Sequence, residues 1–408
     1  MRALLFHGLS QLRRVTLSRP VAAASFAMAA TSMGAAYVPC EADAATLKPP
    51  SAFVRVVSYN VLSSHLCEPE HFVKCASADL DPPTRLARVR QQLEPHMEAG
   101  AVLCLQEVSS QWVGDLTPFF EARGYTFVSG LYGRRFNGYM GVGLAWPSAR
   151  FESEAVDISR AADTKPWPAP PSPPPPPPLV TRWWRSCKSW CTRLVSRPMP
   201  KRGRPEVEPI SEAARRQNVL LSVRLRCRTT GARFCVSTYH MPCLFGSDPK
   251  VQVMVLHAGL VAKHAAHFAD GLPHVLAGDF NFAPETAPYS LMLKGSLPKD
   301  HPHYPPMPPD DTWQPALPQP LRSAYLEALG VEPELTNLAM TKGQAEPFVG
   351  TLDYIFVSDA WAVRGVRSLP TRQEVLPNCV SYPTASEPSD HVLIWADLDP
   401  AAPVAPAA

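Results

Sequence analysis

The chain has 408 residues, of which 46% are hydrophobic and 18% are charged, so it is long enough and apolar enough to bury a sizeable core. The formal net charge of +3 is too small to identify a partner by bulk charge. The ten cysteines include no CxxC pair, which excludes a zinc-finger pattern and a small disulfide framework. We therefore expect mostly free thiols in a reducing compartment.

The first forty residues contain four arginines and no acidic residue. An acid-free leader rich in Ala and Ser and bearing arginines is typical of an organelle transit peptide. Residues 21–38 form an uncharged run, but its Ala, Ser and Thr content makes membrane insertion only the second interpretation. We expect residues 1–50 to be a targeting leader, cleaved after import into the mitochondrion, with the plastid as the alternative.

Strand patterns begin directly after this leader. Residues 53–62 are typical of a buried strand running into a loop, and residues 84–99 carry apolar side chains at helical spacing. Further strands are predicted at 101–108, 139–146, 218–225, 233–240, 273–281, 352–358 and 391–398, with a second helix at 251–268. Many strands with interspersed helices indicate an α/β layered domain.

The strand pattern breaks between residue 147 and about residue 214. Residues 166–178 are nearly all proline and cannot form helix or sheet, and residues 181–205 contain eight Lys or Arg and no acid. We interpret 147–214 as an insertion into a single domain spanning 51–400, with a second proline-rich loop at 298–320 and a disordered tail at 401–408. A basic helix bearing Trp within 181–204 would suit an anionic membrane surface or a nucleic-acid backbone, and a solvated spacer is the alternative.

Polar residues stand at the ends of the predicted strands. Asp279 and Asn281 follow one apolar run and, on extended backbone, point to the same side. The others are Asn60, Glu107, His240, Asp353, Asp390 and His391. Each alone is more often a cap or turn residue than a catalyst, but loops at strand ends converge in α/β sheets. Carboxylate and amide oxygens without thiolates suit a hard cation such as Mg²⁺ or Mn²⁺, and an Asp–His pair offers a general acid or base.

Six of these segments also occur in a recognisable order. "SYNVL", "LQEV", "TYHMP", "GDFN", "LDYIF" and "SDH", spread over residues 54–398, resemble the motif series of the endonuclease/exonuclease/phosphatase (DNase I-like) superfamily. The resemblance implies an α/β four-layer sandwich, with two mixed β-sheets face to face and helices outside. It also implies metal-dependent hydrolysis of a phosphoester. It is nearest to the deadenylase, nocturnin and 2′,5′-phosphodiesterase branch, although "MPC" at 241–243 departs from the deadenylase pattern.

The resemblance implies a metal site. Glu107 matches the glutamate that binds Mg²⁺, with Mn²⁺ as a substitute, and Asn60 and Asp390 match residues near the metal. Glu68 and Asn137 are further residues that would line the same cleft. All of these are oxygen donors, as a hard divalent cation requires.

The resemblance also implies the catalytic and phosphate-binding residues. Asp279 matches the aspartate that orients or deprotonates the attacking water, and Asn281 the asparagine that holds a non-bridging oxygen. His391 matches the histidine that contacts the scissile phosphate, and Asp353 matches its acidic partner. His240 matches a residue that helps to bind phosphate. Attack on a phosphodiester adds charge to its oxygens, and these donors would offset it.

These features predict a metal-dependent phosphodiester hydrolase, a monomer that trims RNA from its 3′ end. The alternatives on the same fold are a DNA endonuclease, a sphingomyelinase-like lipid phosphodiesterase and a small-molecule phosphatase. The non-enzyme alternative is a catalytically inactive binding module, which the complete set of motif residues disfavours. Tyr132, Phe136 and Tyr139 are candidates for stacking on bases, although strand packing explains Tyr139 equally well.

Overall fold

The computed structural model describes residues 53–167 and 208–400. The predicted leader, the basic stretch at 181–204 and the tail at 401–408 lie outside the described residues, so they stay predictions. Within the described residues, no helix combines the length and apolarity needed to cross a bilayer.

Two six-stranded sheets form the centre of the molecule. The order in the first sheet is β13 (Trp361–Val366), β14 (Ile394–Pro400), β1 (Val54–Asn60), β2 (Val102–Val108), β4 (Gly141–Pro147) and β3 (Tyr125–Leu131). The order in the second sheet is β5 (Phe151–Arg160), β6 (Val219–Cys227), β7 (Arg233–His240), β8 (His274–Asp279), β12 (Asp353–Val357) and β9 (Arg322–Ser323). A short hairpin-like pair joins β10 (Asn337–Ala339) and β11 (Phe348–Gly350). Both large sheets are mixed, because β1 and β2 run parallel, as do β7 and β8, among otherwise antiparallel neighbours.

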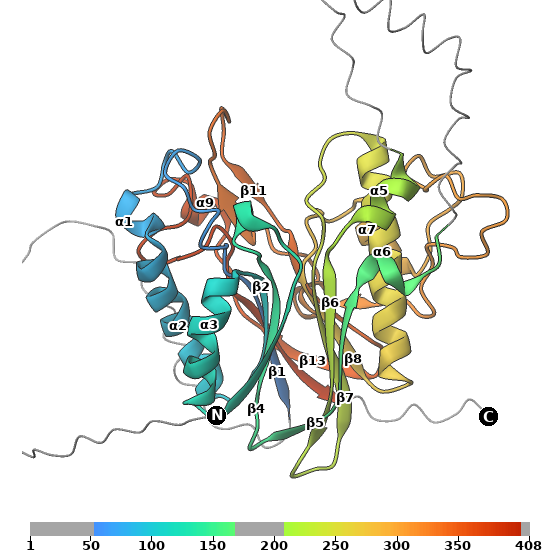
Figure 1. Ribbon diagram of the computed structural model, residues 1–408, viewed down its shortest axis with the longest axis horizontal. Helices are drawn as coiled ribbons and strands as arrows, with labels where there is room; N and C mark the ends of the chain where they lie inside the picture. The colour runs from blue at the N-terminus through green and yellow to red at the C-terminus, as the bar shows by residue number, and fades with distance from the viewer. Residues whose placement is uncertain (1–52, 168–207, 401–408) are drawn as a thin grey trace, which may run out of the picture. The chain divides into compact units, whose positions relative to one another are not determined.

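Helices cover the outer face of each sheet (Figure 1). Helices α2 (Pro82–Glu98) and α3 (Ser110–Glu121) lie outside the first sheet, and α5 (Pro209–Arg215), α6 (Asp248–Ala269) and α7 (Ala287–Lys294) lie outside the second. The shorter elements are α1 (Ser77–Leu80), α8 (Ala324–Leu329), α9 (Arg372–Val375), η1 (Arg135–Asn137) and η2 (Ala161–Thr164). The predicted four-layer sandwich is confirmed.

Three apolar layers account for the buried strands of this sandwich. One lies between the two sheets and includes Val56, Leu144, Val223 and Val275. The other two lie between each sheet and its helices, around α2 and α3 on one side and α6 and α7 on the other. A central strand with both faces covered has no solvent-facing side. Every residue of β1 is accordingly buried, including the polar Arg55, Ser58 and Asn60.

Helix α2 shows how local sequence sets an element. Asp81 is its N-cap, and the Asp81 carboxylate accepts a 2.9 Å hydrogen bond from the backbone N–H of Thr84. Pro82 occupies the first helical position, where a missing N–H costs nothing. The residues predicted to form the apolar face, Leu86, Val89, Leu93 and Met97, are all buried.

The sequence predicted that the strand pattern breaks from residue 147 to about residue 214, and this is wrong for residues 151–160. Strand β5 pairs with β6 from Phe151 opposite Cys227 to Arg160 opposite Val219. It lies at the edge of its sheet, and much of its surface is exposed or half-buried. An edge strand with polar side chains lacks the continuous apolar run of a central strand, so the sequence pattern hid it. Residues 298–320 contain turns but no helix or strand.

Candidate active site

Strand ends from both sheets bring the predicted polar residues to one place. Asn60 is the last residue of β1, and Glu107 lies near the end of the parallel strand β2. In the second sheet His240 ends β7 and is paired with Asp279, the last residue of β8. Strand β12 runs antiparallel to β8, so its first residue, Asp353, is paired with Asp279 from the other side. The sheet register therefore places His240, Asp279 and Asp353 in one row.

The Asp279 carboxylate is the centre of the cluster. Its Oδ2 accepts a 2.9 Å hydrogen bond from Asn60 Nδ2 and lies 3.5 Å from His240 Nε2 and 3.7 Å from His391 Nε2. Its Oδ1 accepts a 2.9 Å hydrogen bond from the backbone N–H of Asn281. Burial raises the pKa of Asp279 to about 6, against the opposing effect of the two histidines. The carboxylate is thus oriented by fixed donors and poised to exchange a proton near neutral pH.

His391 and Asp353 form an acid–histidine pair. Asp353 Oδ2 lies 2.7 Å from His391 Nδ1 and also accepts a 2.7 Å hydrogen bond from the Thr336 hydroxyl. Although burial opposes it, the carboxylates of Asp353, Asp279 and Asp390 raise the pKa of His391 well above its ordinary value. The raised pKa favours the imidazolium form of His391, whose Nδ1 faces Asp353 and whose Nε2 lies toward Asp279.

A local distortion of β2 aims Glu107 into the site. The pairing of β2 with β4 shifts register between Leu105 and Val108, and Glu107 has a left-handed backbone with φ of 59°. Bulges of this kind redirect a side chain beside an active site. The Glu107 carboxylate accepts a 3.2 Å hydrogen bond from Asn60 Nδ2 at Oε1 and a 3.1 Å bond from the Ser63 N–H at Oε2.

Asn281 and Asp390 lie at the margins of the cluster. Asn281 has a left-handed φ of 51°, and its Nδ2 donates a 2.9 Å hydrogen bond to the Met241 carbonyl. The Asp390 carboxylate accepts a 3.2 Å hydrogen bond from Asn337 Nδ2. Burial raises the pKa of Asp390, while the nearby His391 opposes the shift.

Two groups of side chains have the spacing needed to hold a metal ion. In each of them the ligand atoms lie within 4.8 Å of one another: Glu107 with His240 and Asp279, and Asp279 with Asp353 and His391. In the second group, His391 Nδ1 and Asp353 Oδ2 already form a hydrogen bond with each other, so neither atom is free to bind a metal. The first contains Glu107, a half-buried carboxylate with lone pairs left over, and fits a hard divalent cation.

The other two predicted metal residues have different surroundings. The amide oxygen of Asn60 accepts a 3.0 Å hydrogen bond from the Leu62 N–H, so its amide nitrogen faces the carboxylates of Glu107 and Asp279. Asn60 thereby holds the two carboxylates together. Asp390 belongs to neither of the two groups, although its charge interacts with that of Glu107.

Several residues of the site were not recognised from the sequence. The Tyr132 hydroxyl lies 2.8 Å from His240 Nδ1, so Tyr132 orients this ring instead of only offering a stacking surface. Thr336 and Asn337 support Asp353 and Asp390 from a region of very short strands with no clear periodicity. Of the two further cleft residues predicted, Glu68 lines a pocket, whereas Asn137 is buried within a loop.

A two-sheet α/β sandwich with carboxylates and histidines gathered at one edge defines a hydrolase type of site. The sequence from residue 57 to residue 391 matches the Endonuclease/Exonuclease/phosphatase family. The chain therefore belongs to this family.

The curated relatives and solved structures agree with that assignment. Over 362 residues the chain is 25% identical to 2′,5′-phosphodiesterase 12 from Homo sapiens. The matched region covers 85% of this chain and 52% of that protein. It is 31% identical over 134 residues to the CCR4-Not complex 3′-5′-exoribonuclease subunit Ccr4 from Mycosarcoma maydis, covering 32% of this chain and 19% of that protein. The chain thus spans about half the length, at most, of these relatives.

Among solved structures, the fold matches that of ANGEL2, described as a 2′,3′-cyclic phosphatase. The TM-score is 0.61 at 19% identity, and the match covers 86% of this chain and 96% of that one. The likeness shows that the two share a fold. The two curated relatives agree with the deadenylase and 2′,5′-phosphodiesterase branch predicted from the motifs.

Proposed function

We propose that this protein is a divalent-metal-dependent phosphodiester hydrolase that shortens RNA from its 3′ end. The observation that carries the proposal is the surroundings of Asp279, whose Oδ2 faces Asn60, His240 and His391 within 3.7 Å. The printed names of the relatives, a 2′,5′-phosphodiesterase and a 3′-5′-exoribonuclease, support RNA as the substrate.

The geometry supports a division of roles in hydrolysis. Asp279, ionised above its pKa of about 6, accepts the proton of a water molecule that attacks the phosphorus. The His391 imidazolium donates from Nε2 to a phosphate oxygen, and its pairing with Asp353 holds the ring and the charge in place. Asn281 keeps a second amide hydrogen for a non-bridging oxygen, since only one is used on the Met241 carbonyl.

A metal fits this arrangement at Glu107, with Asp390 and Asn60 close by. When bound there, a divalent cation would offset the charge that develops on the phosphate oxygens. Oxygen donors without a thiolate favour Mg²⁺ or Mn²⁺ over softer metals. His240, held by the Tyr132 hydroxyl, presents Nε2 toward Glu107 and Asp279 and is placed to contact the same phosphate.

Two exposed aromatic rings support a nucleic-acid substrate over a lipid headgroup. Phe245 follows His240 and is 50% exposed, and Phe348 precedes Asp353 and is 37% exposed. Their ring centroids are 6.4 Å apart. Exposed aromatic rings beside a phosphate site are platforms for stacking bases.

The test is hydrolysis by the full chain of labelled poly(A), mixed-sequence RNA, abasic DNA, sphingomyelin and NADPH, with Mg²⁺ or Mn²⁺ and with EDTA. We expect stepwise shortening of RNA from the 3′ end that EDTA abolishes and that Glu107→Gln reduces at least about a hundredfold. As a matched control, Arg364→Ala changes an exposed ion pair on β13 and retains full activity. Preferential nicking of abasic DNA, release of phosphocholine, or activity indifferent to EDTA would each contradict the proposal.

A further inference from the structure

The loop between β3 and β4, residues 132–140, exposes an unusual set of side chains beside the candidate active site. Phe136 is 71% exposed and Tyr139 is 51% exposed, and Arg134 and Arg135 are exposed with them. Within the described residues neither guanidinium forms an ion pair, unlike most arginines on the sheet surfaces. Unpaired cations next to an unburied aromatic ring are suited to a ligand that carries both a phosphate and a base.

The loop is rigidly built, so these side chains are held in place. Asn137 is buried, and its side-chain oxygen accepts a 2.6 Å hydrogen bond from the Arg134 N–H. Gly138 has a left-handed φ of 65° and packs so closely on His65 that a Cβ would lie 2.5 Å from the ring. The carbonyl of Gly138 accepts a 2.9 Å hydrogen bond from the Ser110 N–H at the start of α3.

The same loop is joined to the catalytic cluster at two points. Ser63 donates its backbone N–H to Glu107 at 3.1 Å and its hydroxyl to the Asn137 carbonyl at 2.9 Å. At the beginning of the loop, the Tyr132 hydroxyl lies 2.8 Å from His240 Nδ1. Ser63 therefore links the loop to Glu107, and Tyr132 links it to His240.

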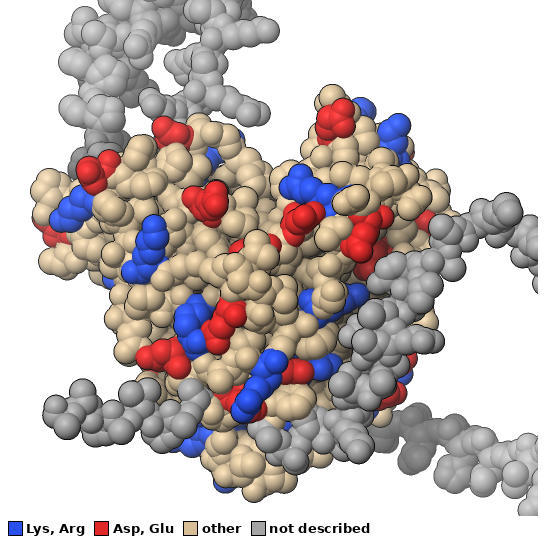
Figure 2. Space-filling view, turned by 180° about the vertical axis from the view of Figure 1, so that it is seen from behind, with Lys and Arg blue, Asp and Glu red and all other residues tan. Residues whose placement is uncertain are grey.

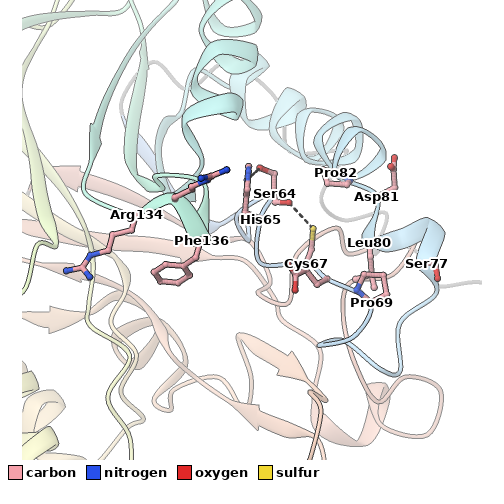
Figure 3. Close-up of a pocket in the computed structure, with 12 residues that line it drawn as sticks. Ser64, His65, Cys67, Pro69, Ser77, Leu80, Asp81, Pro82, Arg134 and Phe136 are labelled. Carbon is pink, nitrogen blue, oxygen red and sulfur yellow. Dashed lines mark hydrogen bonds between the residues drawn. The ribbon is translucent and has the colours of Figure 1, made fainter.

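A pocket of about 920 Å³ lies against this loop. Arg134 and Phe136 lie on the loop side of it, opposite the turn that carries Ser64, His65 and Cys67, and their side chains extend away from that turn (Figure 3). Sites for small ligands have volumes of about 300–1,000 Å³, so the pocket is large enough for one nucleotide. Glu68 also lines the pocket, and its carboxylate is an acceptor for base or ribose donors.

The pocket and the Phe245–Phe348 pair are carried by different segments of the fold. The pocket is lined by residues that follow β1 and β3 of the first sheet, whereas Phe245 follows β7 of the second sheet and Phe348 begins β11 of the two-stranded sheet. The catalytic cluster draws residues from both six-stranded sheets. The exposed Phe136 and the Phe245–Phe348 pair are thus two separate aromatic surfaces.

We propose that this pocket is a second nucleotide subsite, in which Phe136 stacks on a base and Arg134 and Arg135 bind the adjoining phosphate. It holds the nucleotide on the side of the scissile phosphate away from Phe245 and Phe348. The inference rests on the proposed function and deepens it, because an enzyme with two such subsites selects a substrate with nucleotides on both sides of the bond.

The test compares the affinities of adenosine monophosphate and an adenosine dinucleotide by calorimetry, with Mg²⁺, in the Asp279→Asn background that blocks turnover. In the parent we expect the dinucleotide to bind at least about tenfold more tightly, the range of a single base stack. Phe136→Ala lowers this ratio of dinucleotide to mononucleotide affinity most of the way to one. Phe136→Tyr, which keeps a ring, retains the parental ratio. Replacing Arg134 and Arg135 by Ala weakens the dinucleotide more than the mononucleotide and reduces the salt dependence of binding.

Arg364→Ala, at an exposed arginine on the edge strand β13, is the matched control and leaves the affinity ratio unchanged. A Phe136→Ala variant with the parental ratio would overturn the second subsite. If the wild-type chain shortens RNA while this ratio is unaffected, the proposed function stands and only the subsite is wrong. If the wild-type chain neither binds nor cleaves nucleotides, both are wrong.

Discussion

At the scale of single residues, the candidate site contains strained backbone and one very close contact between neighbouring strands. Glu107 and Asn281 are both left-handed although neither is glycine, and so is Leu62, which follows Asn60. Such residues persist only where surrounding contacts hold them, and they cluster at functional sites. Gly278, just before Asp279, approaches β7 so closely that a Cβ would lie 1.9 Å from the Tyr239 carbonyl oxygen. Only glycine fits at this position.

Asp279→Asn tests the general base. The substitution keeps the shape of the side chain but removes the ability to take a proton, so we expect kcat to fall about 10²- to 10⁴-fold. Turnover of RNA at saturating substrate measures it, and a melting temperature within a few degrees of wild type shows that the fold is retained. The control is Asp157→Asn on β5, which replaces a carboxylate paired with His264 of α6 and should have normal turnover. A tenth or more of wild-type kcat in Asp279→Asn would exclude the role.

At the scale of elements, buried polar residues join segments that are far apart in the chain. Arg85 of α2 is fully buried and donates 2.6 Å hydrogen bonds to the carbonyls of Val61, Leu62 and Pro388. It thereby ties the loop after β1 to the segment that leads into Asp390. His257 of α6 connects three elements, because its ring contacts the Tyr239 hydroxyl of β7 and the Ala213 carbonyl of α5.

Arg85→Met is predicted to destabilise the protein strongly. The substitution keeps much of the side-chain volume but leaves three buried carbonyls without their donor, so we expect a loss of about 3 kcal/mol or more in the free energy of unfolding. Urea unfolding measures it. Gln91→Met, at an exposed position of the same helix, should change the free energy by less than about 0.5 kcal/mol. Equal effects of the two substitutions would show that the Arg85 contacts do not stabilise the fold.

His257 is predicted to make stability depend on pH. Burial lowers the pKa of His257 to about 4, so the folded protein resists a proton that the unfolded chain accepts near its ordinary value. Its contribution to stability is therefore complete above the unfolded pKa and falls as the pH drops toward 4, by about 1 kcal/mol per pH unit.

The matched variant is His257→Gln, which still accepts from Tyr239 and donates to Ala213 but does not titrate. Denaturant unfolding between pH 7 and pH 4.5 should show a shallower loss of stability in the variant than in wild type. Parallel curves for the two proteins would mean that His257 does not contribute to the pH dependence.

At the scale of the whole molecule, the surface charge is mixed. On the face shown in Figure 2, Lys and Arg side chains are interspersed with Asp and Glu side chains instead of gathering in one patch. This agrees with the small net charge of +3. Long-range attraction to a polyanion is correspondingly weak, so substrate affinity must come from local contacts near the catalytic cluster.

Replacing residues 168–207 by a Gly/Ser linker of equal length is predicted to preserve the fold and the chemistry. The β5–β6 pairing runs from Phe151 to Arg160 without these residues, and loop composition has a small effect on stability. We expect a melting temperature within about 4 °C of wild type and normal turnover of a dinucleotide. Retention on RNA or anionic vesicles should fall if the basic stretch 181–204 contributes. Loss of folding would assign the replaced segment to the core.

The sequence by itself determined the central strands, helices α2 and α6, and the residues at the strand ends. Strands β1, β2, β7 and β8 are covered on both sides, so each is rich in apolar residues, and polar residues stand at or near its end. Because parallel neighbours end at the same edge of a sheet, the convergence of Asn60, Glu107, His240 and Asp279 could also be predicted.

Only the tertiary structure decided the edge strand β5, the left-handed backbone of Glu107 and Asn281, and the supporting roles of Tyr132 and Thr336. These depend on groups that are distant along the chain: Asn60 donates to Asp279, 219 residues away, and Tyr132 contacts His240, 108 residues away. Local periodicity reports which face of an element is buried, but not which distant side chain lies against it. Hydrogen-bond partners and backbone strain are therefore settled only when the two sheets pack.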